Sequence, residues 1–364
     1  MHRTRGGGDR SVGPGRSQAA VRACNHAPMR RRLIRILIAL MLMVAIAYFG
    51  YMGWQGSEEL VHPPNPNAAC YTPGTLGWTY EAINYDRTSD DELLTREDDL
   101  AHCSTPGQAA GSEVMASDGI RIAGWWIPAA AEIGPDGPTV VIVHGYGDNK
   151  SGMLEYATFL HDRYNLVMFD LRNSGQSTGT LTTQGSQEQG DLAAILDWVV
   201  GVKQPAQLVV FGQSMGGHTA VNVVAEDPRV RALILDSTHD RLGTAMVARI
   251  GNAGYPFGEV GYLPIALGSW IRSGENVLAS DPIDALIRLG SRPVLLLQGG
   301  SDRDVPPSSA DRMAAATAAA GVELELRVCE GADHGRLDET CPDDYGRWLN
   351  DFLERVLASA LPPG

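Results

Sequence analysis

From about residue 113 onward, short apolar runs alternate with segments of helical periodicity. The runs are rich in β-branched and aliphatic residues, and they read "TVVIVHG", "NLVMFDL", "QLVVFGQS", "RALILDS", "RPVLLLQGG" and "ELRVCEG". Stretches between them, such as "EQGDLAAILDWVVGV", repeat their apolar residues at helical spacing. Strands that are apolar on both faces are typical of a parallel sheet covered by helices on both sides. The pattern therefore predicts an α/β fold with a mostly parallel central sheet.

Two further segments refine this picture. The stretch "EVMASDGIRIAGWWIP" predicts a hairpin that turns at Asp118-Gly119. Residues 237–290 form an insertion between two predicted strands and are rich in glycine, aromatic and apolar residues. We interpret this insertion as a small helical cap over the site; the alternative is a longer crossover with no lid function.

The N-terminal region carries the strongest continuous apolar run. Residues 36–54 hold 19 residues without a formal charge, which as a helix rise about 28 Å and match a bilayer core. The basic stretch "MRRRLIR" precedes the run, and a positive flank stays in the cytoplasm. We therefore expect residues 1–35 to be a basic, disordered cytoplasmic segment, residues 36–54 a signal anchor, and the rest extracytoplasmic. The alternative is secretion after cleavage of a signal peptide, because Ala45-Ile46-Ala47 has the form of a cleavage site.

A linker is expected between the anchor and the folded domain. The stretch "VHPPNPNAACYTPGT" is rich in proline and asparagine, and "DRTSDDELLTREDDL" is strongly acidic. Such composition suits an extended segment and a solvated face. Residues 55–112 are therefore interpreted as a stalk with an acidic extension, and residues 113–364 as the main domain.

Charge and cysteine content restrict the partners and the compartment. Of the 29 basic residues, nine are arginines before residue 36, which leaves 20 basic and 42 acidic residues for the rest of the chain. Such an acidic body disfavours nucleic acid as a partner. Four of the five cysteines follow the apolar run, and they allow three pairings. Proximity favours Cys70 with Cys103 and Cys329 with Cys341; four free thiols are the alternative.

The stretch "VVFGQSMGGHTA" places Ser214 between glycines, directly after a predicted strand and before a predicted helix. This context indicates a nucleophile elbow, a strained turn that projects the serine hydroxyl above the sheet edge. Gly212 and Gly216 are then small so that neighbouring backbone passes close by. A tight turn without catalytic function is the alternative.

A serine nucleophile needs a histidine base and an acid that orients it, and in this type of sheet the chain order is serine, acid, histidine. Of the histidines after Ser214, only His334 leaves room for an acid after a later strand. The stretch "LLLQGGSDRDVPP" supplies Asp302, which we favour as the first acid after the strand, with Asp304 as the alternative.

An oxyanion requires preorganised donors. We expect them to be the backbone N–H groups of Met215, just after the nucleophile, and of Tyr146 in "VHGYGDNK". The sequence disfavours a phosphate-binding function for that loop, because Asn149 and not glycine precedes Lys150 and the motif G-x-x-x-x-G-K-[ST] is absent. No HExxH or CxxC metal motif occurs, and no cofactor or metal is expected.

Over residues 113–356 the chain resembles the α/β-hydrolase family. The His144-Gly145 loop, "FDLRNSGQSTG", the elbow at Ser214, the Asp302 loop and His334 stand in the order of that family. Within it the sequence looks most like membrane-anchored bacterial hydrolases related to Bem46 and the abhydrolase-domain proteins. The resemblance implies a serine hydrolase that acts on an acyl ester or thioester without a cofactor, and Asp-x-x-Val-Pro at Asp302 recurs in the family. Tyr146, where many relatives have a smaller residue, and the acidic stalk are departures.

The sequence is compatible with three functions. The leading hypothesis is hydrolysis of a small or lipid-like acyl ester or thioester. A serine peptidase of prolyl-oligopeptidase type is the second, although no propeller repeats precede the domain. The third is a catalytically silent binding protein on the cell surface.

Overall fold

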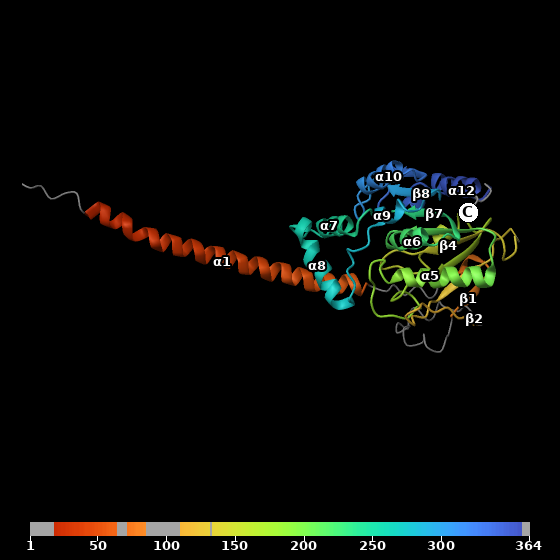
Figure 1. The fold of residues 1–364 in the computed structure, drawn as a ribbon, viewed down its shortest axis with the longest axis horizontal. Helices are drawn as coiled ribbons and strands as arrows, with labels where there is room; N and C mark the ends of the chain where they lie inside the picture. Colours follow the sequence, from red (N-terminus) through yellow and green to blue (C-terminus); the bar gives the residue numbers. More distant parts are fainter. Residues whose placement is uncertain (1–17, 64–70, 85–109, 132, 359–364) are drawn as a thin grey trace, which may run out of the picture. The chain divides into compact units, whose positions relative to one another are not determined.

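The structure is a computed structural model that describes residues 18–63, 71–84, 110–131 and 133–358 (Figure 1). It forms two compact units, Met1–Tyr51 and Met52–Gly364, whose boundary falls within helix α1 (Gln18–Val61). Met29–Val61 of this helix has a mean hydropathy of 2.4 over its most apolar window, and the helix is long and apolar enough to cross a membrane.

Among the described residues, a nine-stranded sheet forms the centre of the second unit, in the order β2-β1-β3-β5-β4-β6-β7-β8-β9. Its strands are β1 (Glu81–Ile83), β2 (Ala110–Ser112), β3 (Gly124–Ile127), β4 (Thr139–Val143), β5 (Asn165–Phe169), β6 (Leu208–Gln213), β7 (Val230–Asp236), β8 (Val294–Gly299) and β9 (Leu324–Cys329). From β5 to β9 all neighbours pair in parallel, whereas β3 is antiparallel to both β1 and β5. The six predicted parallel strands are confirmed. Their carboxyl ends meet at one edge of the sheet, where ligand sites of such folds gather.

Helices cover both faces of this sheet. The described helices after α1 are η1 (Pro73–Leu76), α4 (Leu154–Ala157), α5 (Glu188–Trp198), η2 (Val199–Lys203), α6 (Met215–Glu226), α7 (Leu242–Asn252), α8 (Gly258–Ser273), α9 (Pro282–Leu286), α10 (Ser308–Ala320), α11 (Leu337–Thr340) and α12 (Pro342–Ala358). One apolar core lies between the sheet and α5, α6, α9 and α10, and the other between the sheet and α4 and α12. Because β4–β8 are buried on both faces, their apolar runs are continuous rather than alternating.

The remaining segments partly differ from expectation. The hairpin turns at Asp118-Gly119 and is closed by one antiparallel bridge between Met115 and Arg121. Residues 237–290 are mostly helical and contain α7, α8 and α9, and Figure 1 shows α7 and α8 beyond one end of the sheet. We call these residues the cap segment.

The expectation of a stalk from residue 55 requires correction. Met52–Val61 lies within the compact unit, and Ser57 and Val61 are fully buried. The backbone N–H of Thr182 donates to the carbonyl of Val61 at 2.8 Å, and β1 extends the central sheet. Packing against distant parts of the chain therefore makes residues 55–61 and 81–83 part of the folded unit. The acidic run and the expected Cys70–Cys103 pair lie outside the described residues.

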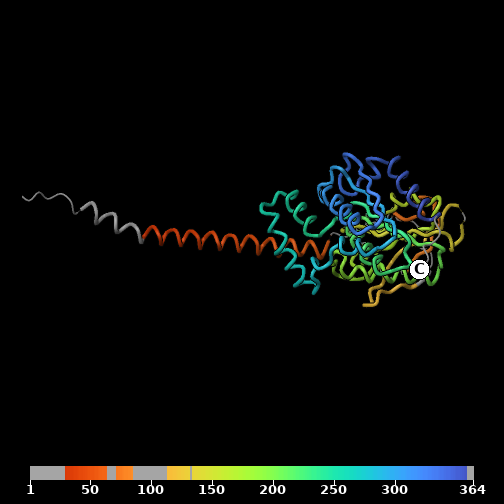
Figure 2. Tube along the Cα trace, turned by 45° about the horizontal axis from the view of Figure 1, so that its top comes forward, coloured from red at the N-terminus to blue at the C-terminus, as the bar shows by residue number. Residues whose placement is uncertain are grey.

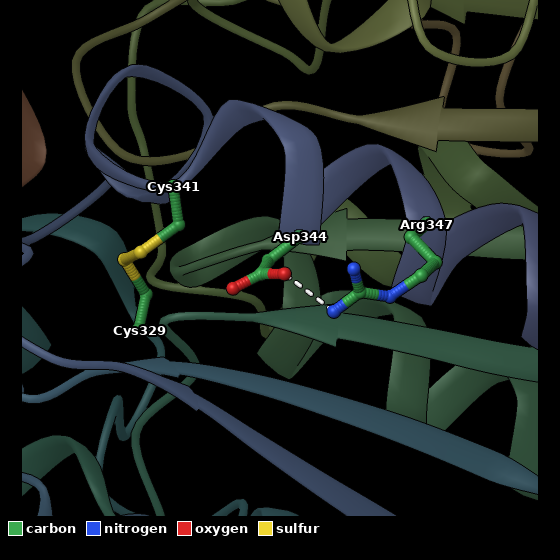
Figure 3. Close-up of a disulfide and its surroundings, with 4 residues drawn as sticks. All are labelled: Cys329, Cys341, Asp344 and Arg347. Carbon is green, nitrogen blue, oxygen red and sulfur yellow. Dashed lines mark hydrogen bonds and ion pairs between the residues drawn. A yellow bond between two sulfur atoms is a disulfide. The ribbon is translucent and has the colours of Figure 1, made fainter.

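The Cys329–Cys341 disulfide is confirmed, with its Cα atoms 6.2 Å apart. It joins the end of β9 to the residue before α12, whose first two turns carry the Asp344–Arg347 ion pair (Figure 3). The closed loop contains His334.

Removing this disulfide should lower the free energy of unfolding by about 3 kcal/mol, because a loop of this length regains its chain entropy in the unfolded state. The sequence also predicts that reduction lowers hydrolytic activity at a denaturant concentration that leaves the domain folded, since it frees the loop that carries His334. Activity and circular dichroism, measured together across a denaturant titration with and without reductant, check both effects. Parallel loss of activity and fold would contradict the second.

Candidate active site

Ser214 occupies the turn between β6 and α6. Its backbone has φ 52° and ψ −117°, a conformation that L-residues rarely adopt and that costs about 1–3 kcal/mol. The backbone N–H of Ser214 donates to the carbonyl of Asp236 at 2.8 Å, and its own carbonyl accepts the N–H of His218 at 3.1 Å. These bonds hold the strained turn in place and leave the side chain at the carboxyl edge of the sheet.

The glycines around Ser214 are required by close backbone contacts. A Cβ at Gly212 would meet the carbonyl oxygen of Gly216 at 2.5 Å, and one at Gly216 would collide with the carbonyl oxygens of Val143 and His144. A Cβ at Gly217 would collide with the Thr238 hydroxyl. Only glycines let α6 start this close to β4 and β7, which is the geometry of a nucleophile elbow.

The structure brings Ser214, His334 and Asp302 together from three separate loops. Oδ2 of Asp302 lies 2.9 Å from Nδ1 of His334, and Nε2 of His334 lies 3.0 Å from Oγ of Ser214. An ionised carboxylate only accepts hydrogen bonds, so Nδ1–H donates to Asp302 and Nε2 is left to accept the serine proton. This arrangement is competent for proton transfer from the serine hydroxyl.

Asp302 and Asp304 occupy different environments. The Asp302 side chain is fully buried, and its Oδ1 accepts the backbone N–H groups of Asp304 at 2.9 Å and Val305 at 2.7 Å. Asp304 is partly exposed and lies 3.4 Å from Nε of Arg249. The structure therefore places Asp302, and not Asp304, against the histidine.

Burial and nearby carboxylates act oppositely on His334. Burial lowers the pKa of His334, but the hydrogen bond and charge of Asp302, together with the charges of Asp304 and Asp236, outweigh it, so the pKa is raised above its usual value. Sequence reasoning missed Asp236, which is fully buried at the end of β7. Burial raises its pKa to about 6, against hydrogen bonds from Tyr345 and Ser237. The sequence did contain a signal for Asp236, because this carboxylate directly follows an apolar run.

The two expected oxyanion donors flank Ser214. Met215 is the first residue of α6, and a helix leaves the N–H groups of its first turn without an intrahelical partner. Tyr146 follows β4, and its loop approaches the elbow so closely that a Cβ at Gly145 would lie 3.4 Å from the Ser214 Cβ. The Tyr146 hydroxyl donates to the carbonyl of Glu59, and Tyr146 lines both cavities that contain Ser214 and His334.

Two cavities meet at Ser214 and His334 and differ in character. The first, of about 310 Å³, is polar and is lined by residues including Asp148, Glu155, Arg336 and Asp338. The second, of about 40 Å³, is narrower and mostly apolar. Its lining comes from Leu60, Met215, Leu242, Ala245, Met246 and Val305, with His239 and Arg249 among the polar members. A separate cavity of about 580 Å³, lined by α7 together with Tyr262 of α8 and Asp281, does not include Ser214.

Two other histidines follow Ser214 but do not reach its hydroxyl. Nε2 of His239 lies 3.2 Å from Nδ1 of His218, and Nε2 of His218 lies 3.0 Å from the Ser280 hydroxyl. Burial lowers the pKa of His239 to about 4, so this side chain is a neutral, polar part of the apolar cavity wall at neutral pH.

A serine on a strained strand-to-helix turn, hydrogen-bonded to histidine and carboxylate at the carboxyl edge of a parallel sheet, is the arrangement of α/β-type hydrolases. Residues 138–263 match the family model described as alpha/beta hydrolase fold. The chain is also 32% identical to YfhR of Escherichia coli K12 over 273 residues, and the aligned region covers 73% of this chain and 86% of YfhR. The chain belongs to the α/β-hydrolase family.

Two further similarities agree with this assignment. Protein bem46 of Schizosaccharomyces pombe is 28% identical over 174 residues, or 47% of this chain and 53% of bem46, so the resemblance to Bem46-like proteins is confirmed. The Pyrococcus furiosus esterase Pf2001 superposes with a TM-score of 0.61 at 22% identity and covers 81% of this chain and 98% of its own. At that identity the likeness shows the fold.

Proposed function

We propose that the protein is a carboxylic-ester hydrolase with Ser214 as nucleophile. The observation that carries the proposal is the continuous hydrogen-bond chain from Ser214 through His334 to Asp302 at a strained elbow. Turnover of matched ester, thioester and amide substrates tests it, with the ester or thioester expected to be hydrolysed fastest.

The reaction follows from the positions of these groups. Oγ of Ser214 attacks the carbonyl carbon while its proton passes to Nε2 of His334, and Asp302 stabilises the imidazolium that forms. The N–H groups of Tyr146 and Met215 stabilise the oxyanion. Collapse breaks the ester C–O bond, and His334 returns the proton to the leaving alkoxide. Water, deprotonated by His334, then attacks the acyl carbon; the bond between this carbon and Oγ of Ser214 breaks, and His334 returns the proton to Oγ.

The two cavities favour a substrate with two unlike ends. The narrow cavity beside α7 is mostly apolar and suits an acyl chain, whereas the wider, acidic cavity suits a polar leaving group. The sequence predicts a cap over the site, but Ile265, Leu267, Trp270 and Ile271 of α8 do not line either cavity at Ser214. The apolar wall comes instead from Leu242, Ala245 and Met246 of α7.

We expect kcat/KM to climb from acetyl towards medium-chain esters and then to level off. Each buried methylene contributes about 0.8 kcal/mol, or nearly fourfold, until the narrow cavity is full. A series of esters with one leaving group and increasing acyl length measures this. A profile that is flat or that falls from acetyl onward would exclude an acyl-binding role for the α7 cavity.

The acid side of the pH profile should report His334. The base must be neutral at Nε2, and the pKa of His334 is raised by Asp302, so kcat/KM should fall as the pH decreases through a value above the ordinary histidine pKa of about 6.5. The pH dependence of kcat/KM on a short-chain ester gives this midpoint. A midpoint below 6.5 would contradict the assigned partnership.

We further propose that residues 36–54 anchor the protein in the cell membrane and that the catalytic unit is extracytoplasmic. Support comes from the apolar helix, its basic flank and the Cys329–Cys341 disulfide, which suits an oxidising compartment. Protease digestion of intact spheroplasts tests the topology, with cleavage of the catalytic unit expected. N-terminal sequencing distinguishes an anchor from a segment cleaved near Ala47.

The same assays distinguish two other functions from this one. A serine peptidase would use the same hydrogen-bonded groups, and it is favoured if amide turnover exceeds ester turnover. A silent surface-binding protein would turn over neither and would not react with a fluorophosphonate.

A further inference from the structure

Helix α8 is attached to the last turns of α1 by close packing. A Cβ at Gly268 would lie 2.7 Å from the carbonyl oxygen of Gly53 and 2.6 Å from the Ser57 hydroxyl. Arg272 lies over the ring of Trp54 at 4.0 Å, donates to Ser57 at 2.9 Å and pairs with Glu58 at 2.6 Å. All these residues belong to the same compact unit, and Figure 2 shows α8 across this end of α1. The position of α8 is thus fixed relative to residues 53–58.

The other face of α8 presents large apolar side chains to the exterior. Its buried residues are mostly small (Gly261, Ile265, Ala266 and Ser269). The exposed ones are Val260, Leu263, Leu267, Trp270 and Ile271, with Tyr255 and Phe257 just before the helix and Trp54 beside it. Ile271 is 77% exposed and Phe257 68%. This distribution is the reverse of that expected for a helix at a water-exposed surface. We call these eight residues the α8 face.

We propose that the α8 face docks the catalytic unit onto the lipid surface of the membrane that α1 spans. The inference rests on the proposed anchor. The uncharged run ends at Trp54, so the chain leaves the hydrocarbon region at the residues on which α8 packs. At 1.5 Å per residue, Ser57 lies only about 4.5 Å further along the helix. The α8 face is thereby held at the depth of the lipid headgroups, where apolar helix faces and tryptophans are stabilised.

Charge distribution favours apolar contact over attraction to anionic lipid. The chain after residue 35 has 42 acidic and 20 basic residues, and Arg272 is already paired with Glu58. Docking should therefore occur on zwitterionic bilayers and should resist added salt. A second copy of the chain is the other occupant that such a face suits, and the experiment below separates the two.

Docking would bring the active site to the lipid surface. The narrow cavity at Ser214 is lined by Leu60, in the last turn of α1, and by α7, which packs against α8. An acyl chain in the bilayer would then enter beside the elements that contact the membrane.

Fluorescence of the full chain in phosphatidylcholine vesicles tests the docking. Lipids brominated on their acyl chains should quench wild-type tryptophan emission. The quenched share should fall in Trp270→Phe and persist in Trp348→Phe, a matched change in α12, in low and high salt alike. Quenching that Trp270→Phe leaves unchanged would overturn the proposal, as would disulfide-linked dimers formed efficiently through Ile271→Cys in these vesicles.

A kinetic experiment addresses the same face independently. Leu267→Glu combined with Ile271→Glu should lower hydrolysis of a vesicle-borne ester by about tenfold or more, because carboxylates resist transfer into the interface. Hydrolysis of a water-soluble acetyl ester should be unchanged. Val202→Glu, which alters an exposed apolar residue elsewhere, should affect neither substrate. Equal loss on both substrates would overturn a membrane-specific role. If no ester is turned over by wild-type protein, the proposed function fails, and the quenching result still decides the docking.

Discussion

Replacing Ser214 with alanine should reduce ester hydrolysis by on the order of a million-fold. The substitution removes the atom that forms the acyl-enzyme, while the elbow keeps its backbone bonds to Asp236 and His218. Single-turnover and steady-state assays on a short-chain ester measure the loss. Circular dichroism verifies that the variant is folded.

The same experiment includes two comparisons. His334→Ala should lower ester hydrolysis nearly as much. The double variant Ser214→Ala/His334→Ala should be no less active than either single variant, because the losses do not add for residues that act as a unit. Ser301→Ala, a matched change at an exposed residue of the Asp302 loop, should retain wild-type activity. More than a few per cent residual activity in Ser214→Ala would mean that another group is the nucleophile.

Asp302→Asn should lower kcat by about ten-thousand-fold. An amide in place of the carboxylate can donate to Nδ1 of His334, which favours the tautomer with its proton on Nε2 and prevents that atom from accepting the serine proton. The loss of negative charge also removes the stabilisation of the imidazolium. Steady-state kinetics on the short-chain ester measure the effect.

The neighbouring aspartate is the control for this prediction. Asp304→Asn should cost little, because the Asp304 carboxylate lies at the partly exposed rim near Arg249 and Asn252. An Asp304→Asn variant more impaired than Asp302→Asn would show that the acid has been assigned to the wrong residue.

The sequence was sufficient for the parallel strands and for the proximity of Ser214, Asp302 and His334. Buried strands produce continuous apolar runs, and each polar candidate follows one directly, so the parallel arrangement brings them to one edge. The role of the elbow glycines could also be predicted from the sequence. The structure agrees, because the neighbouring backbone lies too close to Gly212 and Gly216 for any side chain there.

Other features depend on contacts between distant segments and could not be predicted from the sequence. Nothing in the composition of residues 55–61 indicates that Tyr146, Asn173 and Thr182 hydrogen-bond their carbonyls. The cap segment was recognised as apolar, but an apolar helix gives no sign of whether it covers a cavity or faces outward. In α8 the small residues face inward because α1 approaches closely, and the large ones face out.

Reaction of the wild-type full chain with a fluorophosphonate, followed by peptide mass spectrometry, tests the central claim most directly. The phosphonyl group should be found on the Ser214 hydroxyl at near one equivalent, with loss of ester hydrolysis in proportion to labelling. His334→Ala should label far more slowly, because the serine then lacks its base. Ester hydrolysis that persists in protein fully labelled at Ser214, or a label on another residue, would contradict the account.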